Sequence, residues 1–130
     1  MSATEKEAII LSRIGQGQFR KQLLNYWKGC SITSFNKLDI LVASHIKPWK
    51  DANNFERTDL FNGLVLLPNY DKLFDKGYIT FDKKGKIIYS KFISDTEIKI
   101  LGMEKELSLI RIEEQHKTYL NYHNENCFIN

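Results

Sequence analysis

Four polar side chains between residues 45 and 75 suit metal-assisted hydrolysis. His45 follows an apolar run, Asn62 precedes a glycine, and Asp71 and Asp75 are four residues apart. A neutral histidine can take a proton from water, and carboxylate oxygens are the ligands that hard divalent cations prefer. Together they would supply a base and a metal site, provided that the fold brings them to one place.

Two short apolar runs flank the segment between His45 and Asn62. Residues 38–46 and 63–67 are rich in Leu, Ile and Val and predict two strands joined by a long loop. An antiparallel pair would form a hairpin with His45 and Asn62 at the same end. Each residue also has a purely structural interpretation, because a histidine can simply end a strand and an asparagine before glycine is an ordinary turn signal.

The segment "PNYDKLFDKG" predicts a short helix directly after the second strand. Pro68 suits the first turn of a helix, and Gly77 can end it. Asp71 and Asp75 would then lie on one face of this helix. The order strand, loop, strand, helix therefore predicts that the histidine, the amide and the two carboxylates converge. Asp75 could instead cap the helix or pair with a neighbouring lysine.

The flanking regions predict further helices and a second hairpin. Helical periodicity over residues 4–27 predicts a helix that the glycines of "GQG" break or bend, and these glycines lack the context of a phosphate-binding loop. The segments "YITFD" and "KIIYSKF" predict a hairpin. Two helices follow, in "SDTEIKILGM", where Ser94 and Glu97 form a capping box, and in "EEQHKTYLNYHNENCF". The predicted fold class is α+β.

The composition is that of a single globular domain. The 130 residues are 42% hydrophobic and 27% charged. No apolar run reaches the roughly 18 residues of a membrane helix, and the N-terminus does not have the pattern of a secretory signal, so we expect a cytoplasmic protein. Two cysteines, Cys30 and Cys127, fit a reducing compartment. The net charge of +3 permits binding to nucleic acid without requiring it.

Several segments in combination resemble one enzyme family. They are "RIGQGQFR", "CSIT", "ASHIKPW", "NGLVLLPNYDKLFDKGYITFD" and "YLNYHNENCF". They resemble the HNH nucleases with a ββα-metal (His-Me finger) core, in particular a bacterial restriction-type subgroup with a Ser-His-Ile-Lys-Pro-Trp signature. The resemblance implies one nuclease domain over residues 1–130, with a core at about 38–77, N-terminal helices, a second hairpin and C-terminal helices. It implies a metal-dependent endonuclease that hydrolyses phosphodiester bonds of double-stranded DNA, as the cleavage domain of a restriction or defence system with a fused or partner recognition module.

The resemblance also implies roles for individual residues. His45 corresponds to the general base, and Asn62 corresponds to the asparagine that ties the ends of the loop together. Asp71 and Asp75 stand where the family places metal-binding histidines, and Ser44 stands where related nucleases often have a metal-binding Asp or His. The implied ligands are the two aspartates, with Ser44 as a weak ligand and Asn62 as an alternative one. Oxygen ligands favour Mg²⁺ or Mn²⁺ over Zn²⁺.

Four basic residues are candidates for contact with DNA, namely Arg13, Arg20, Lys47 and Lys72. Solvation explains the charge of Lys47 equally well, and internal salt bridges explain the two arginines as well as phosphate contacts do. No structural zinc is expected, because Cys30 alone cannot replace paired Cys-x-x-Cys motifs.

Two other functions remain open at this stage. Ser44 and the aspartate at position 71 are consistent with a catalytically degenerate HNH fold that binds nucleic acid without cutting it. The chain could equally be an interaction module of a larger restriction or defence protein. His116 and His123, seven residues apart in a predicted helix, suggest either a metal pair or a helix packed against the core. Trp49 suggests either a core residue or a group that stacks on a base.

Overall fold

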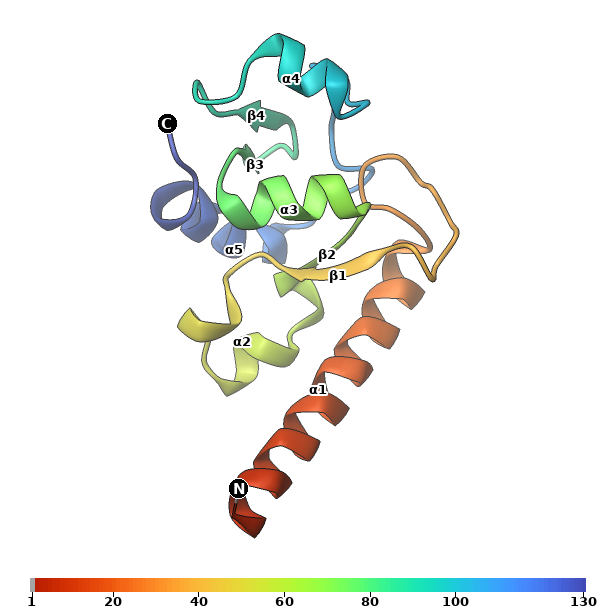
Figure 1. Ribbon diagram of the computed structural model, residues 1–130, viewed down its shortest axis with the longest axis vertical. Coiled ribbons are helices and arrows are strands. Elements are labelled where there is room, and N and C mark those ends of the chain that lie inside the picture. Colours follow the sequence, from red (N-terminus) through yellow and green to blue (C-terminus); the bar gives the residue numbers. More distant parts are fainter. Residues whose placement is uncertain (1) are drawn as a thin grey trace.

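The computed structural model describes residues 2–130, except for the side chains of residues 8 and 11–15. The chain has an α+β fold, as the sequence predicts. Figure 1 shows the elements, which are α1 (Ala3–Trp27), β1 (Val42–His45), α2 (Asn54–Thr58), β2 (Gly63–Leu66), α3 (Pro68–Lys76), β3 (Ile79–Phe81), β4 (Ile87–Tyr89), α4 (Asp95–Ile100) and α5 (Glu114–Asn126).

The first hairpin lies between two helices. Strands β1 and β2 are antiparallel, with His45 opposite Gly63, so the ends of the connecting loop meet beside His45. Helix α3 packs across one face of this hairpin and the C-terminal half of α1 packs on the other side (Figure 1). Trp27 of α1 donates a hydrogen bond from Nε1 to the carbonyl of Gly63, at 3.2 Å. A side chain at position 63 would collide with Phe19 and Leu23, so the glycine allows this close approach.

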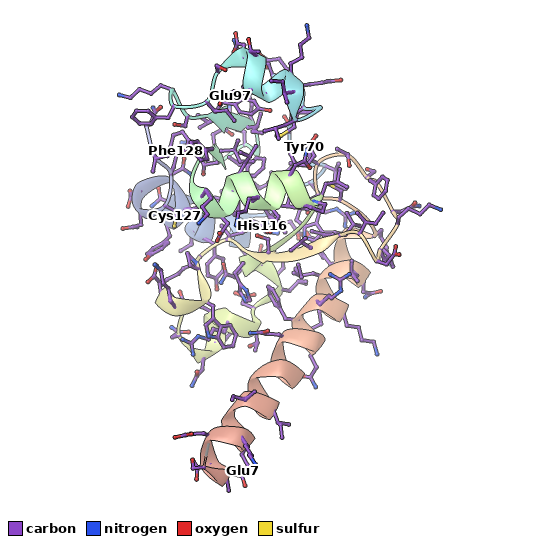
Figure 2. The ribbon with its side chains drawn as sticks, in the orientation of Figure 1. Glu7, Tyr70, Glu97, His116, Cys127 and Phe128 are labelled. Carbon is purple, nitrogen blue, oxygen red and sulfur yellow. The ribbon has the colours of Figure 1, made fainter. Side chains whose placement is uncertain are left out.

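Helix α1 runs unbroken through its glycines, so the prediction of a break or bend there is wrong. A glycine inside a helix costs only about 1 kcal/mol relative to alanine. The burial of Phe19, Leu23 and Trp27 on the hairpin supplies more stabilisation than this cost. The N-terminal half of α1 extends away from the rest of the fold, with Glu7 near its exposed end (Figure 2).

The first strand is shorter than the predicted run of residues 38–46, because β1 begins only at Val42. The preceding segment forms a turn, and Arg20 of α1 binds it. The two terminal nitrogens of the Arg20 guanidinium donate to the carbonyls of Leu38 and Leu41, each at 2.7 Å. These carbonyls are therefore satisfied without a partner strand, which explains why an apolar run with exposed Leu38 and Ile40 is not extended into the sheet.

The predicted long loop between the strands contains α2 and two short 3-10 turns, Trp49–Asp51 and Leu60–Asn62. Asn53 begins α2 with a capping box, in which its side chain and that of Glu56 each accept from the other's backbone N–H. Lys47 at the start of the loop forms an ion pair with Glu56 at 3.0 Å. The loop is therefore held by specific polar contacts at several points along its length.

The second half of the chain covers the outer side of α3. The predicted second hairpin is present as β3 and β4, and α4 begins with the predicted capping box of Ser94 and Glu97. Gly77 ends α3 in a left-handed conformation, with φ of 82°, and the C-terminal segment passes so close that a side chain there would strike the carbonyl of Cys127. Helix α5 completes the core, and His116 lies inside it in Figure 2. No helix in residues 2–130 has the length and apolar character that crossing a bilayer requires.

Candidate active site

His45 is the central residue of the candidate site, at the end of β1. Its ring stacks on Phe19, with centroids 4.0 Å apart and planes 7° from parallel, and meets the ring of Trp49 edge to face at 5.8 Å. Its Nε2 lies 2.8 Å from the carbonyl oxygen of Arg57. Because a carbonyl can only accept, Nε2 carries the proton, and in the neutral ring Nδ1 holds a lone pair. Among the groups that the structure describes, which leave out the side chains of residues 8 and 11–15, Nδ1 has no hydrogen-bond partner.

The environment of His45 favours the neutral ring. Partial burial lowers the pKa of His45 below its ordinary value of 6.5 and outweighs the bond to the Arg57 carbonyl, which raises it. The positive charge of Arg57 lowers the pKa further. An unprotonated Nδ1 near pH 7 is what a general base requires.

Asn62 ties the loop to the hairpin through both ends of its fully buried amide. Its Oδ1 accepts from the backbone N–H of Lys47 at 2.7 Å, and its Nδ2 donates to the carbonyls of Lys47 and Glu56 at 3.3 and 2.9 Å. This arrangement matches the loop-tying role that the resemblance implies. It also commits the amide oxygen to the backbone, so nothing in the geometry favours Asn62 as a metal ligand.

Ser44, Asp71 and Asp75 gather on the opposite face of the hairpin from Phe19, against α3. Ser44 is buried, and its hydroxyl lies near enough to the half-buried carboxyl group of Asp71 to affect the pKa of that group. Burial raises the pKa of Asp71 above its ordinary value, the Ser44 hydroxyl lowers it, and the negative charge of Asp75 raises it. A buried carboxylate with a second carboxylate beside it is suited to a cation.

Two hollows meet at His45. A small cavity of about 40 Å³ opens on the α3 side, and its lining comprises Ser44, His45, Ile46, Pro48, Phe74, Asp75, His123 and Cys127. A larger groove of about 440 Å³ opens on the α1 side, and its lining comprises Gln16, Phe19, Arg20, Val42, Ala43, His45 and Trp49. The structure therefore brings His45, Ser44 and Asp75 to one cavity, with Asp71 joined to it through Ser44. Asn62 stands apart, behind the loop.

The acidic residues fit a hard divalent cation that keeps much of its water. The described residues contain no group of three or more His, Cys, Asp or Glu side chains arranged to hold a metal ion. Mg²⁺ commonly binds through only one or two carboxylates, with water and substrate phosphate completing its shell. Asp71 and Asp75, with the hydroxyl of Ser44 beside them, offer this kind of incomplete oxygen site.

The predicted DNA-binding residues differ in whether their side chains are already bound to other groups of the protein. Lys72 is exposed on α3. Lys47 pairs with Glu56 and lies over the ring of Tyr122 at 4.8 Å, and Arg20 binds two backbone carbonyls. The side chain of Arg13 lies outside the described residues.

The sequence did not identify Phe19, Trp49 or Arg57 as residues that position His45. Phe19 comes from α1, and the backbone carbonyl of Arg57 fixes the tautomer of His45. The segments "RIGQGQF" and "IKPW" contain the two aromatic residues, so the resemblance marked their neighbourhood. A backbone carbonyl carries no side-chain signal and could not have been found in this way.

His116 and His123 belong to the packing of α5. His123 donates from Nε2 to the Phe74 carbonyl at 3.0 Å and accepts at Nδ1 from the Thr80 hydroxyl at 2.8 Å. His116 accepts at Nδ1 from the backbone N–H of Glu113 at 2.9 Å. Both rings are almost fully buried. The metal-pair interpretation of these two histidines has no support in this arrangement.

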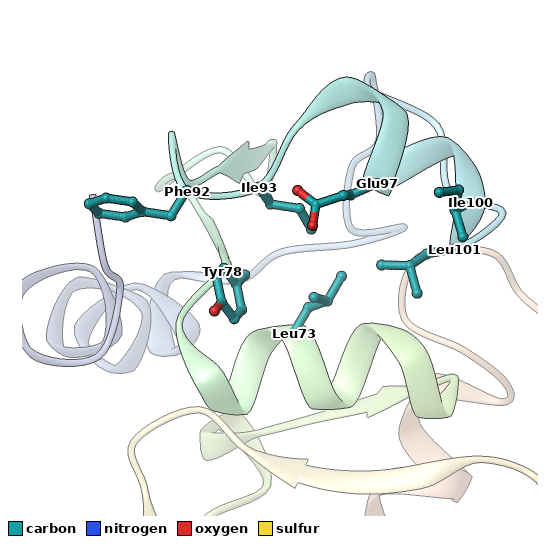
Figure 3. A pocket seen from close by; sticks show the side chains of 7 residues that line it. All are labelled: Leu73, Tyr78, Phe92, Ile93, Glu97, Ile100 and Leu101. Carbon is teal, nitrogen blue, oxygen red and sulfur yellow. The ribbon is translucent and has the colours of Figure 1, made fainter.

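An apolar groove of about 430 Å³ lies between α3 and α4, as Figure 3 shows. Leu73 and Tyr78 point into it from α3 and the residues that follow, facing Leu101 beyond the end of α4. Its one ionisable carboxylate, Glu97, already accepts from the backbone N–H of Ser94. This groove has no base or ligand pair, which sets it apart from the cavity at His45.

Comparisons with known proteins agree with this geometry. Residues 30–82 match the HNH endonuclease family, and this segment contains both strands of the first hairpin, the loop and α3. The chain is similar in fold to a modification-dependent TagI restriction endonuclease, with a TM-score of 0.50 and 19% sequence identity, over 81% of this chain and 35% of that protein. The comparison with curated proteins finds no match. The sequence match and the fold likeness together support an HNH domain built on this hairpin and α3.

Proposed function

We propose that this chain is a metal-dependent endonuclease that hydrolyses the phosphodiester bonds of DNA. The observation that carries the proposal is the state of His45. Its Nε2 is tied to the Arg57 carbonyl, its Nδ1 has no partner among the described side chains and backbone groups, and its pKa is lowered. The match of residues 30–82 to HNH endonucleases supports the same chemistry.

In the proposed reaction, His45 is the general base. Nδ1 takes a proton from the water that attacks phosphorus, and the 3′ oxygen leaves. The imidazolium that forms is stabilised by its Nε2–H bond to the Arg57 carbonyl, which also fixes the orientation of the ring, and Phe19 covers one face of the ring. Asn62 keeps this carbonyl in place indirectly, because it binds the carbonyl of the adjacent residue, Glu56.

The cofactor in this proposal is Mg²⁺ or Mn²⁺, held by Asp71 and Asp75 with Ser44 as a weak third ligand. A bound divalent ion would neutralise the charge that builds on the phosphate oxygens in the transition state. Burial is the main cause of the raised pKa of Asp71, and the charge of Asp75 adds to it; a bound cation would offset both effects.

The proposed substrate is double-stranded DNA, and the proposed setting is a restriction or defence system. The fold likeness to a restriction endonuclease motivates this setting. The chain spans 35% of that protein, so a fused or partner module that recognises the DNA forms part of the proposal.

Plasmid nicking in the presence of Mg²⁺, Mn²⁺, Ni²⁺ or Zn²⁺ tests the proposal. We expect Mg²⁺ or Mn²⁺ to support cleavage, His45→Ala to abolish it, and Asp71→Asn to raise the metal concentration needed for half-maximal rate. Glu114→Gln is the matched control, because it removes a carboxylate from the exposed start of α5. If the folded wild type cleaves DNA with none of these metals, the proposal fails.

A second function, DNA binding without cleavage, is favoured by one observation. Ser44 is a weak ligand, and within residues 2–130 the site gathers no third strong one. Isothermal titration calorimetry distinguishes the two functions. Heat on adding Mn²⁺ that disappears in Asp71→Asn supports the enzyme, and the absence of heat together with intact DNA binding supports the binding module.

A further inference from the structure

We infer that Arg57 binds a DNA phosphate beside His45 and so anchors the strand to be cut. The inference rests on the proposed function, because it assigns a new substrate contact to the same site. Arg57 lies in α2, within the loop that joins the two strands. Its backbone carbonyl already holds His45, and its side chain has a separate role in this inference.

The guanidinium of Arg57 is held in one place by Trp49, the same residue whose ring meets that of His45. It lies over the ring of Trp49 at 4.4 Å, and its Nε donates to the Trp49 carbonyl at 3.0 Å. The backbone carbonyl of Arg57 lies 2.8 Å from Nε2 of His45, so residue 57 is in direct contact with the base. Because Trp49 also meets the ring of His45, the cation and the base share one rigid support.

The terminal nitrogens of Arg57 remain available. Among the described residues they have no hydrogen-bond acceptor and no ion-pair partner. The nearby carboxylates of the loop have other partners. Glu56 pairs with Lys47, and Asp59 accepts from the hydroxyl of Tyr119 at 2.6 Å. A guanidinium left with its forked end free can bind a phosphate through two parallel hydrogen bonds.

The other basic groups near the site do not offer this combination. Both terminal nitrogens of Arg20 bind backbone carbonyls, and the ammonium group of Lys47 is paired with Glu56. Lys72 is exposed on α3 and has no such rigid support from Trp49. Arg57 is therefore the cation that best meets three conditions at once: proximity to His45, rigidity and free donors.

DNA binding in buffer that contains EDTA tests the inference without any need for cleavage. The variants are Arg57→Gln, Arg57→Lys and the control Arg111→Gln. Arg111 also stacks on a tryptophan, Trp27, and donates to a backbone carbonyl, that of Tyr26 at 2.8 Å, so it matches Arg57 in charge and packing. All three substitutions leave the Arg57 carbonyl, and hence the acceptor of His45, in place.

We expect Arg57→Gln to weaken binding of a duplex oligonucleotide about tenfold at low salt, measured by fluorescence anisotropy. The slope of log affinity against log salt should become less steep by about 1, because one phosphate contact is lost. Arg57→Lys should keep the slope and lose part of the affinity, and Arg111→Gln should match the wild type. Circular dichroism confirms that each variant is folded.

Two results would overturn the inference. One is a folded Arg57→Gln that binds DNA with wild-type affinity and slope, even if its cleavage is slower, since Arg57 would then act only through His45. The other is a wild type that binds no DNA at low salt. A third result separates the two proposals. If no tested metal supports cleavage by the wild type, the nuclease proposal is refuted. If Arg57→Gln still makes the slope of log affinity against log salt less steep by about 1, the phosphate contact stands.

Discussion

Two histidines of this chain have nearly the same surroundings and differ at one nitrogen. His45 stacks on Phe19 at 4.0 Å, and His123 stacks on Phe74 at 3.8 Å, both with almost parallel planes. Each donates from Nε2 to a backbone carbonyl, at 2.8 and 3.0 Å. At His123, Nδ1 accepts from the Thr80 hydroxyl, whereas at His45 Nδ1 has no partner in the described part of the structure.

The difference separates a structural histidine from a candidate base. His123 is 2% exposed and uses both nitrogens inside the core, so its ring has no lone pair left for a substrate. His45 lies at the end of a strand, where two hollows meet, and keeps one nitrogen free. Stacking on a phenylalanine and a bond to a carbonyl therefore say little about function, and the free nitrogen is what distinguishes the two.

Replacing each histidine by glutamine tests this comparison most directly. Glutamine keeps an N–H donor but cannot act as a base near pH 7. We expect His45→Gln to slow metal-dependent plasmid cleavage by about 10² to 10⁴-fold. His123 lines the small cavity but has no part in the proposed proton transfer, so His123→Gln should cleave much faster than His45→Gln at a temperature where circular dichroism shows it to be folded. Equal losses of rate in the two folded variants would break the comparison.

The second test measures stability, for which His123 should matter more than His45. His123→Ala should lower the free energy of unfolding by about 3 kcal/mol, because it leaves a cavity in the core and removes the partner of the buried Thr80 hydroxyl. His45→Ala should cost about 1 kcal/mol, because this half-buried ring loses fewer contacts. Urea denaturation followed by circular dichroism measures both. A larger loss at His45 than at His123 would contradict the assignment.

The sequence carried most of the information about the hairpin and the short helix. Short apolar runs, Pro68 and Gly77 predicted the order of β1, β2 and α3, and the register puts His45 beside the end of the loop as expected. The strand starting at residue 38 and the break in α1 were wrong for one physical reason. Both depend on contacts between distant segments, since Arg20 satisfies the carbonyls before β1 and the hairpin buries one side of α1.

The candidate site could be predicted only in part for a related reason. The two apolar runs predicted correctly that His45 and Asn62 lie at the same end of the hairpin, where the loop begins and ends. It could not show that Lys47 is paired while Arg57 is free, because pairing depends on where Glu56 lies in the folded loop. The roles of the site residues remain predictions until the variants are measured.

The third test uses the effect of pH on stability. Burial lowers the pKa of His123 to about 4, from an ordinary value of 6.5. The unfolded chain therefore binds the proton more readily between these values, so stability is lost as pH falls from 6.5 towards 4. His123 should contribute a loss of about 2 kcal/mol at pH 5 relative to pH 8. The lowered pKa of His116 also makes the protein less stable as pH falls, whereas the raised pKa of Asp71 makes it more stable.

Urea denaturation at pH 5 and pH 8 measures this effect, and His123→Gln isolates it. The glutamine variant is less stable at pH 8 but should lose about 2 kcal/mol less than the wild type on going to pH 5. Because the other titrating groups are unchanged, the difference between the two proteins reports His123 alone. An identical pH dependence in both would mean that His123 is not held neutral by the fold.

The smallest expected effect lies in the pH profile of cleavage. Burial is the main cause of the lowered pKa of His45, and Phe19 covers one face of its ring. Phe19→Leu keeps an apolar side chain on α1 but gives the imidazole more contact with water, so the pKa of His45 should rise towards 6.5. Cleavage requires the neutral ring, so the acid limb of the rate should move to higher pH while the plateau rate changes little. The matched change Phe74→Leu removes the ring that stacks on His123 and not the one that stacks on His45, so it should lower stability and move the acid limb less than Phe19→Leu does. If Phe19→Leu instead lowers the plateau and leaves the limb in place, the stacked ring orients His45 without affecting its proton affinity.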